Sequence, residues 1–249
     1  ISAAVLSSTV LCILWLTRWK NDDYLPNNIQ IKEKTGEALS GSIWGGFVLI
    51  AKSRYLTGIC LFIILYAVSI TFVQIQQAQL IESAYTDPTE RTKLFSQIDF
   101  AVNALTLIFQ LFITSRLIGW IGYRATLMLI PVGITIGFGV MAASPMLAVM
   151  IGVEVFRRSG DYAIMKPTRE MLFSVVNREE KYKAKNFIDT AVLRTGNTSS
   201  AWIFAGIKGL GAGAATITGI SLLLGVAWCS VAFWLGGRFV KTSGKASSE

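Results

Sequence analysis

The sequence predicts an all-α, polytopic membrane protein, and three observations support this fold class. The 249 residues are 53% hydrophobic and only 15% charged, with a mean hydropathy of +0.54, whereas soluble domains are about 25% charged. Apolar stretches long enough to cross a hydrocarbon core of about 30 Å recur along the chain. Basic residues gather in alternate connections between these stretches, as expected for a membrane topology.

Seven transmembrane helices are predicted. The first covers residues 1–19. Because it begins with Ile1 and has no basic n-region or cleavage site, we expect the end of a helix in a longer chain rather than a signal peptide. The other spans are expected at 56–81, 97–118, 124–143, 146–166 and 188–236, the last long enough for two helices. Turns are predicted at RLIGWIGYR (116–124) and at Gly209, Gly211 and Gly213.

The basic residues orient these helices. If the connection after residue 19 is cytoplasmic, nearly every basic residue outside the spans is cytoplasmic, and the opposite side holds Arg91, Lys93 and Lys208. The predicted organisation is a cytoplasmic central linker (20–54), a six-helix bundle (55–240) and a cytoplasmic tail (241–249). The net charge of +8 is explained by this topology, so no nucleic-acid partner is expected.

The second part of the linker, ALSGSIWGGFVLIAKSRYL, leaves two interpretations open. It forms either a helix in the membrane interface, with Trp44 and Phe47 on one side, or a plain connector.

Several classes of activity are disfavoured. The chain has no histidine, which excludes catalysis, proton relay and metal ligation by that side chain. Cys12, Cys60 and Cys229 lie in apolar runs and are interpreted as core residues. No Walker loop, G-x-S-x-G sequence or metal-binding cluster is present. We therefore expect a protein that is not an enzyme and that uses no metal or other cofactor.

The charges at membrane depth are concentrated in EVFRRSGDYAIMKPTREMLFSVVNREEKYKAKNFIDTAVLR (154–194). Ionisable residues inside a membrane usually face a polar cavity or pair with each other, so they are candidates for function. The run 177–186 is instead interpreted as a solvated cytoplasmic loop and helix start. The remaining candidates are Glu154, Arg157, Arg158, Asp161, Lys166, Arg169, Glu170, Asp189 and Arg194.

Spacing within this segment predicts how the charges are arranged. Arg157 with Asp161, and Lys166 with Glu170, are i,i+4 partners. Pro167 should kink or break the helix near residues 163–166, and broken helices often form binding sites in transporters.

Arg169 follows the Pro167 break, and its guanidinium could hold phosphate oxygens bidentately. Asp189 and Arg194, five residues apart, are expected to pair with other helices. The alternative for the group is a snorkelling cytoplasmic cluster with structural ion pairs.

Polar residues also mark two other predicted helices. Gln74 and Gln77 share a stripe, flanked by Gln76 and Gln79. The next helix carries Gln97, Asp99, Asn103 and Gln110. These side chains either form hydrogen bonds between helices or line the polar wall of a cavity.

The stretch YAIMKPTREMLFSVVNREEKYKAKNFIDTAVLRTGN (162–197) resembles the ATP/ADP translocases of plastids and obligate intracellular bacteria. The matching positions are Tyr162, Thr168, Glu170, Met171, Lys181, Ile188, Asp189 and Arg194. GGFVLIAKSRYLTGICLFIILY and FSQIDFAVNALTLIFQLF also look like this family, so the resemblance covers most of the chain. Two departures stand out: Arg169 replaces the family's substrate-binding lysine, and Lys166-Pro167 replaces its usual Asp-Ala.

The resemblance implies a major-facilitator-like fold of two six-helix halves. This chain would be the C-terminal half plus the end of the sixth helix, in a bacterial inner (cytoplasmic) membrane. The N-terminal half of the same transporter and membrane lipid would be its partners. The implied function is secondary transport, by alternating access, of a nucleotide or similar phosphorylated anion, of the ATP/ADP exchange type.

The site residues expected to bind this anion are Arg157, Arg158, Lys166, Arg169, Glu170, Asp99 and Asn103, and those expected to couple or gate transport are Glu154, Asp161, Asp189 and Arg194. Two alternatives remain. One is proton-coupled transport of another organic anion, with Asp99, Glu154 or Glu170 carrying the proton. The other is a non-transporting scaffold, in which Arg157, Arg158 and Arg169 would be locked to carboxylates in a dry interior.

Overall fold

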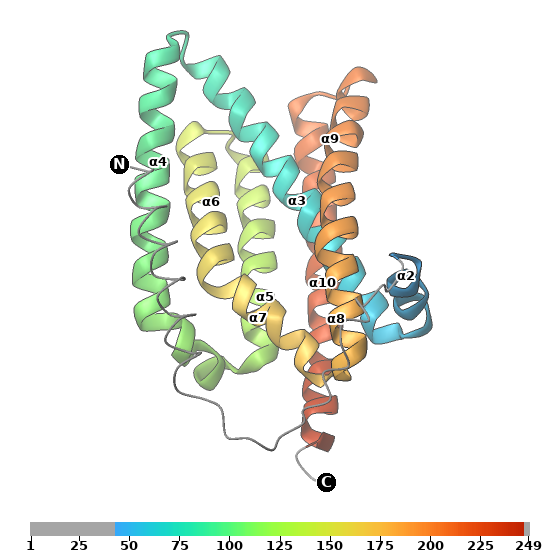
Figure 1. Ribbon diagram of the computed structural model, residues 1–249. Coiled ribbons are helices and arrows are strands. Elements are labelled where there is room, and N and C mark those ends of the chain that lie inside the picture. Colours follow the sequence, from blue (N-terminus) through green and yellow to red (C-terminus); the bar gives the residue numbers. More distant parts are fainter. Residues whose placement is uncertain (1–42, 247–249) are drawn as a thin grey trace, which may run out of the picture. The chain divides into compact units, whose positions relative to one another are not determined.

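The computed structural model describes residues 43–246, and these residues form helices joined by short connections (Figure 1). The prediction of an all-helical chain is confirmed for this part. The predicted helix at 1–19 and the first part of the linker lie outside the described residues, as do the last three residues of the predicted tail.

The helices follow one another along the described residues. They are α2 (Ile43–Lys52), α3 (Arg54–Ala84), α4 (Pro88–Ile108), α5 (Thr114–Ala143), α6 (Leu147–Gly160), α7 (Lys166–Leu172), α8 (Arg178–Phe187), α9 (Leu193–Gly209) and α10 (Ala214–Ala246). Three π-helical segments continue one helix into the next: η1 (Phe109–Ile113), η2 (Asp161–Met165) and η4 (Ile188–Val192). A 3₁₀ turn, η3 (Phe173–Val175), follows α7.

Four stretches of the described chain are long and apolar enough to cross a membrane: Arg54–Ala84, Pro88–Ile113, Arg116–Ala143 and Ala214–Ser243. The helical runs 147–172 and 178–209 have comparable length, but they carry the charged segment. The prediction of a membrane protein is confirmed. The predicted turn after Gly209 is confirmed as well, because α9 ends there and Gly211 has a φ of 84°.

Three local predictions need correction. The span predicted at 97–118 begins earlier, at Pro88. The Asp87 side chain accepts a hydrogen bond from the Thr89 N–H (2.9 Å), and proline fits the first helical turn. The run 177–186, predicted as a loop and helix start, is helical almost throughout, because α8 covers Arg178–Phe187. The turn predicted at 116–124 is a single departure from helical geometry inside α5, at Gly122 (φ 78°, ψ 162°).

The linker helix α2 packs against α8, where the ring of Phe47 lies 6.3 Å from that of Phe187. The side chain of Trp44 is outside the described part, so the interfacial helix remains a prediction.

The core between α3 and α10 positions a residue of the candidate site. Trp228 of α10 is fully buried, and its ring lies 5.7 Å from Phe62 and 5.9 Å from Tyr66 of α3. Each aromatic pair of this kind contributes roughly 0.5–1.5 kcal/mol beyond area burial. Tyr66 is therefore held from behind by a packed aromatic group.

Candidate functional site

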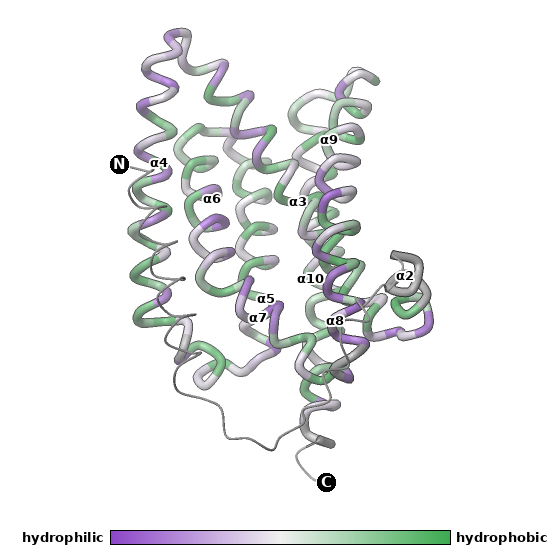
Figure 2. Tube along the Cα trace, in the orientation of Figure 1, coloured by the Kyte–Doolittle hydropathy of each residue, from purple (hydrophilic) through white to green (hydrophobic). Residues whose placement is uncertain are grey.

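A polar cavity of about 470 Å³ is lined by residues of α3, α4, α6, η2 and α9. Its size lies in the range of small-molecule sites. Figure 2 shows that α6 becomes hydrophilic between hydrophobic turns. The lining residues are Tyr66, Ile70, Gln74, Gln77, Phe95, Glu154, Arg157, Arg158, Asp161, Tyr162, Leu193 and Asn197.

The most deeply buried charges of the cavity form an ion pair within one helix. Arg157 Nε and Nη2 donate to Glu154 Oε2 and Oε1, each at 2.7 Å. The exposed fractions of these side chains are only 4% and 3%. Two parallel hydrogen bonds are the geometry in which a guanidinium best satisfies a carboxylate, so the net charge of this pair is close to zero.

The neighbouring arginine bridges two helices. Arg158 Nη1 donates to Asp99 Oδ1 of α4 at 2.5 Å. Here the side chains are 30% and 55% exposed, so the described residues do not enclose either group. An exposed pair contributes at most about 1 kcal/mol. Arg158 can therefore exchange Asp99 for another anion at little cost.

Asp161 is buried beside these pairs without a basic partner among the described residues. Its Oδ1 accepts a hydrogen bond of 2.7 Å from the hydroxyl of Tyr66, and 8% of its surface is exposed. Tyr66 belongs to α3 and Asp161 to η2, so this hydrogen bond joins two elements that line the cavity. Trp228 packs against Tyr66 and so helps to hold the carboxylate in place.

Pro167 explains the π-helical segment that carries Asp161 and Tyr162. The backbone N–H of Lys166 bonds to the carbonyl of Asp161, five residues earlier. Proline has no N–H, so the carbonyls that residue 167 would serve need other donors. Thr114 Oγ1 donates to the carbonyl of Ala163 (2.8 Å), and Gln110 approaches that of Tyr162 (3.5 Å). The predicted break near 163–166 is thus a π-helical turn within a continuous helix, a feature frequent at functional sites.

A second group of charges lies beyond the π-helical turn and does not line the cavity. Arg169 Nη2 is 3.5 Å from Asp189 Oδ1 of η4. Glu170 accepts a hydrogen bond from Lys185 of α8. The expectation that Asp189 pairs with another helix is confirmed, since Arg169 belongs to α7.

Three further predicted residues stand apart. Lys166 lies over the ring of Tyr162, with Nζ 4.1 Å from the centroid. Among the described residues it forms no ion pair. Arg194 forms none either, so the expectation that it pairs with another helix is wrong, because its side chain is exposed on α9. Asn103 is exposed one turn beyond Asp99 on α4 and is outside the cavity lining.

Two predicted pairings are wrong. Arg157 pairs with Glu154 three residues earlier instead of Asp161, because Asp161 is bound to Tyr66. Glu170 pairs with Lys185 instead of Lys166. Helical spacing of i,i+4 allows a pair but does not require it. Arg157 instead uses a partner in the preceding helical turn, and Glu170 uses a partner from another helix.

The amide side chains of α3 divide between the two interpretations. Gln74 and Gln77 line the cavity, whereas Gln76 donates to Ser221 of α10 (3.1 Å) as a hydrogen bond between helices. Sequence reasoning missed Tyr66 and Asn197. Tyr66 could have been found, since residues 66, 70, 74 and 77 share one face of a helix.

A helical membrane protein with ionisable side chains around a polar cavity has the architecture of a solute carrier. The chain belongs to the TLC ATP/ADP transporter family, whose model matches residues 1–143 and 136–239. This is a family of transporters rather than of enzymes.

Curated relatives agree with this family. The chain is 24% identical to ADP,ATP carrier protein 1 of Chlamydia muridarum over 229 residues, which cover 83% of this chain and 42% of the carrier. It is 28% identical to ADP,ATP carrier protein 2 of Chlamydia trachomatis serovar D (78% and 40% covered). For the plastidic ATP/ADP-transporter of Solanum tuberosum the identity is 22% (77% and 34% covered).

The chain spans about two fifths of the length of the chlamydial relatives it matches. No solved structure gave a significant match.

Proposed function

We propose that this chain forms one half of a secondary transporter for a nucleotide or a similar phosphorylated anion. The observation that carries the proposal is the cavity, in which a buried ion pair, a partly exposed arginine, aromatic rings and amides converge. Family membership gives the substrate class its first support, because the matched carriers are named for ADP and ATP.

The chemistry of the lining fits the parts of a nucleotide. Arg158 is the accessible guanidinium and would exchange Asp99 for a phosphate. Lys166, next to Tyr162, would add a second positive charge. The rings of Phe95 and Tyr162 offer surfaces on which a base can stack.

The cavity amides, Gln74, Gln77 and Asn197, offer hydrogen bonds to the base or the sugar.

The other predicted residues receive supporting roles. Glu154 would keep Arg157 neutralised and in place, and Asp161 would hold the Tyr66 side of the cavity. Arg169, Glu170 and Asp189 would form a gate whose ion pairs change partners between states. Asn103 and Arg194 are exposed and would meet the substrate or the other half.

The whole transporter would have a second wall that this chain does not supply. We propose that residues 55–240 are the C-terminal six-helix half of a major-facilitator-like fold and that an N-terminal half closes the cavity. The linker and the tail would face the cytoplasm of a bacterial inner membrane.

Uptake by the complete protein in proteoliposomes tests the proposal. Labelled ADP should enter vesicles preloaded with ATP and should not enter empty vesicles. Arg158→Gln should lower uptake at least tenfold, mainly by raising KM, because it removes a phosphate ligand. Arg116→Gln removes an exposed charge outside the cavity and is the matched control.

Exchange that is insensitive to Arg158→Gln would contradict the site. Loss of any response to nucleotides in the unmodified protein would contradict the substrate class. Arg169→Ala separates the two charge groups, since a gate residue should lower kcat more than it raises KM.

The environment of Asp161 favours a second candidate, proton-coupled transport of another organic anion. Asp161 is a buried carboxylate that lines the cavity and forms no ion pair among the described residues. Uptake driven by a pH gradient, without nucleotide on the opposite side, would favour it.

The structure agrees only in part with the alternative of a non-transporting scaffold. Arg157, Arg158 and Arg169 each pair with a carboxylate, but the first two line an open cavity rather than a dry interior.

A further inference from the structure

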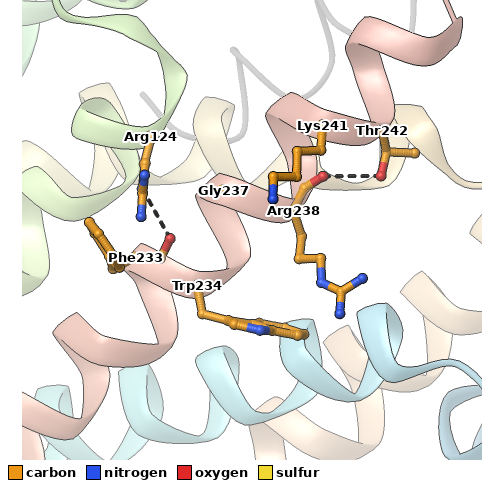
Figure 3. Close-up of a pocket in the computed structure, with 7 residues that line it drawn as sticks. All are labelled: Arg124, Phe233, Trp234, Gly237, Arg238, Lys241 and Thr242. Atoms are coloured by element: carbon orange, nitrogen blue, oxygen red, sulfur yellow. Dashed lines mark hydrogen bonds between the residues drawn. The ribbon is translucent and has the colours of Figure 1, made fainter.

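A second hollow lies away from the polar cavity, where α5 and α10 meet. It has a volume of about 840 Å³, and Arg124, Trp234, Arg238 and Lys241 are among the residues around it. Figure 3 shows these side chains arranged along one stretch of α10, with Arg124 reaching over from α5.

The position of this hollow is the end of a membrane span. Ala214–Ser243 is a candidate span, and Lys241 lies in its last residues. Arg124 lies in the first third of the span Arg116–Ala143. Trp234 is 40% exposed there, as is typical of tryptophan at the headgroup level of a bilayer.

The positive charge of the hollow is not neutralised within the described chain. Arg124 lies over the ring of Phe233 (3.4 Å) and donates to the carbonyl of Phe233 (3.2 Å), while Arg238 lies 5.4 Å from the ring of Trp234. No described carboxylate forms an ion pair with either arginine or with Lys241. Rings and a carbonyl therefore hold the two arginines, and the charges of these arginines and of Lys241 remain available to an anion.

An apolar groove adjoins the basic hollow. It has a volume of about 460 Å³, runs between α3 and α10, and contains Gly58, Leu61 and Val231. Trp234 lines both, and its ring lies where a side chain on Gly58 would be, with Cζ3 2.4 Å from the ideal Cβ position. The absence of that side chain lets the Trp234 ring pack against α3, where it borders both hollows.

We infer that this surface binds an anionic phospholipid of the surrounding bilayer. The phosphate would lie among Arg238, Lys241 and Arg124, and an acyl chain would follow the groove over Leu61 and Val231. A basic pocket at the end of a transmembrane helix attracts anionic headgroups, and each cation adds to the attraction. A soluble phosphate would use the basic hollow but would gain nothing from the groove, so the pair of hollows selects a lipid.

Native mass spectrometry of the complete protein in detergent tests this inference. The protein is titrated with dioleoyl phosphatidylglycerol or with dioleoyl phosphatidylcholine, and the lipid-bound fraction is measured. We expect on the order of tenfold tighter binding of phosphatidylglycerol. The double variant Arg238→Gln/Lys241→Gln should remove this preference, because it deletes two exposed charges near the phosphate.

Arg116→Gln is the matched control, because it removes one exposed charge of α5 outside the hollow. It should bind phosphatidylglycerol as the unmodified protein does. Equal affinity for both lipids, an unchanged double variant, or an equal loss in Arg116→Gln would overturn the inference. So would full displacement of the lipid by millimolar inorganic phosphate, since the site would then be one for the free ion. If the double variant aggregates, Lys241→Gln alone provides the same comparison.

Discussion

Arg157 and Arg158 are adjacent in sequence, yet their partner carboxylates differ sharply in burial. Glu154 is 3% exposed and holds Arg157 through two hydrogen bonds, whereas Asp99 is 55% exposed and holds Arg158 through one. The desolvation of an unpaired buried charge is expensive, while a charge that water reaches is not.

Glu154→Gln should therefore destabilise the protein by roughly 3–5 kcal/mol, because it leaves the guanidinium of Arg157 buried without a counter-charge. The measurement is the midpoint of unfolding of the purified protein in detergent. Asp99→Asn is the matched control, since it makes the same chemical change in an exposed pair, and it should cost about 1 kcal/mol or less. Equal costs for the two variants would show that burial does not govern these pairs.

At this scale the sequence predicts which charged residues line the cavity more accurately than it predicts which of them form ion pairs. The charges at 154–170 were found from their depth in an apolar chain, and the cavity contains Glu154, Arg157, Arg158 and Asp161. Helical spacing permits Arg157 to reach backward or forward with similar ease. Tyr66 decides between these options by occupying Asp161, and it lies 95 positions away in sequence.

At the scale of elements, a hydrogen bond from α5 to η2 compensates for a missing backbone donor. Pro167 has no N–H, and the Thr114 hydroxyl donates to the carbonyl of Ala163 instead (2.8 Å). Thr114→Val should cost about 1–2 kcal/mol, because it leaves this carbonyl unsatisfied. In a Pro167→Ala background the same change should cost clearly less, because the restored N–H can serve the carbonyl.

The measurement is a double-mutant cycle of unfolding free energies at these two positions. Thr92→Val is a useful control, because the hydroxyl of Thr92 bonds within its own helix to the carbonyl of Pro88 (3.0 Å). It should cost the same in both backgrounds. If Thr114→Val costs the same with and without Pro167, the Thr114 hydroxyl does not compensate for the missing N–H of the proline, and this explanation of the π-helical turn is wrong.

Element boundaries follow from the sequence only where a cap or turn residue is present. Asp87 and Gly211 mark ends that local chemistry explains. None of the three π-helical segments contains a proline, and only η2 is followed closely by one, Pro167. The segments η1 and η4 have no such residue beside them in the sequence. They depend on how neighbouring helices pack, which a local pattern does not contain.

At the scale of the whole molecule, the arrangement of basic residues predicts a topology that labelling can test. In a background with all three cysteines replaced by serine, Thr86→Cys should react with an impermeant thiol reagent added outside intact cells. Thr242→Cys should react only after the membrane is permeabilised. Both positions are exposed in the structure, so access depends on the side of the membrane. The reverse pattern would invert the proposed orientation.

The apolar runs were enough to predict a membrane bundle, because hydropathy is a property of each segment alone. The cavity was only partly predictable, because it exists where side chains of α3, α4, α6 and α9 meet. Asn197 and Phe95 carry no signal of this in their own surroundings. The basic hollow on α10 was missed for the same reason: its cations come from α5 and α10.

The two ion pairs of α6 also differ in what a moving helix does to them. Glu154 and Arg157 belong to the same helical turn, so a rigid tilt or slide of α6 carries the pair along intact. Arg158 and Asp99 belong to different helices, so any separation of α6 from α4 must break their contact. The Glu154–Arg157 pair therefore stays intact in every position of α6. The Arg158–Asp99 pair breaks when α6 moves away from α4, so the loss of this contact would mark the movement.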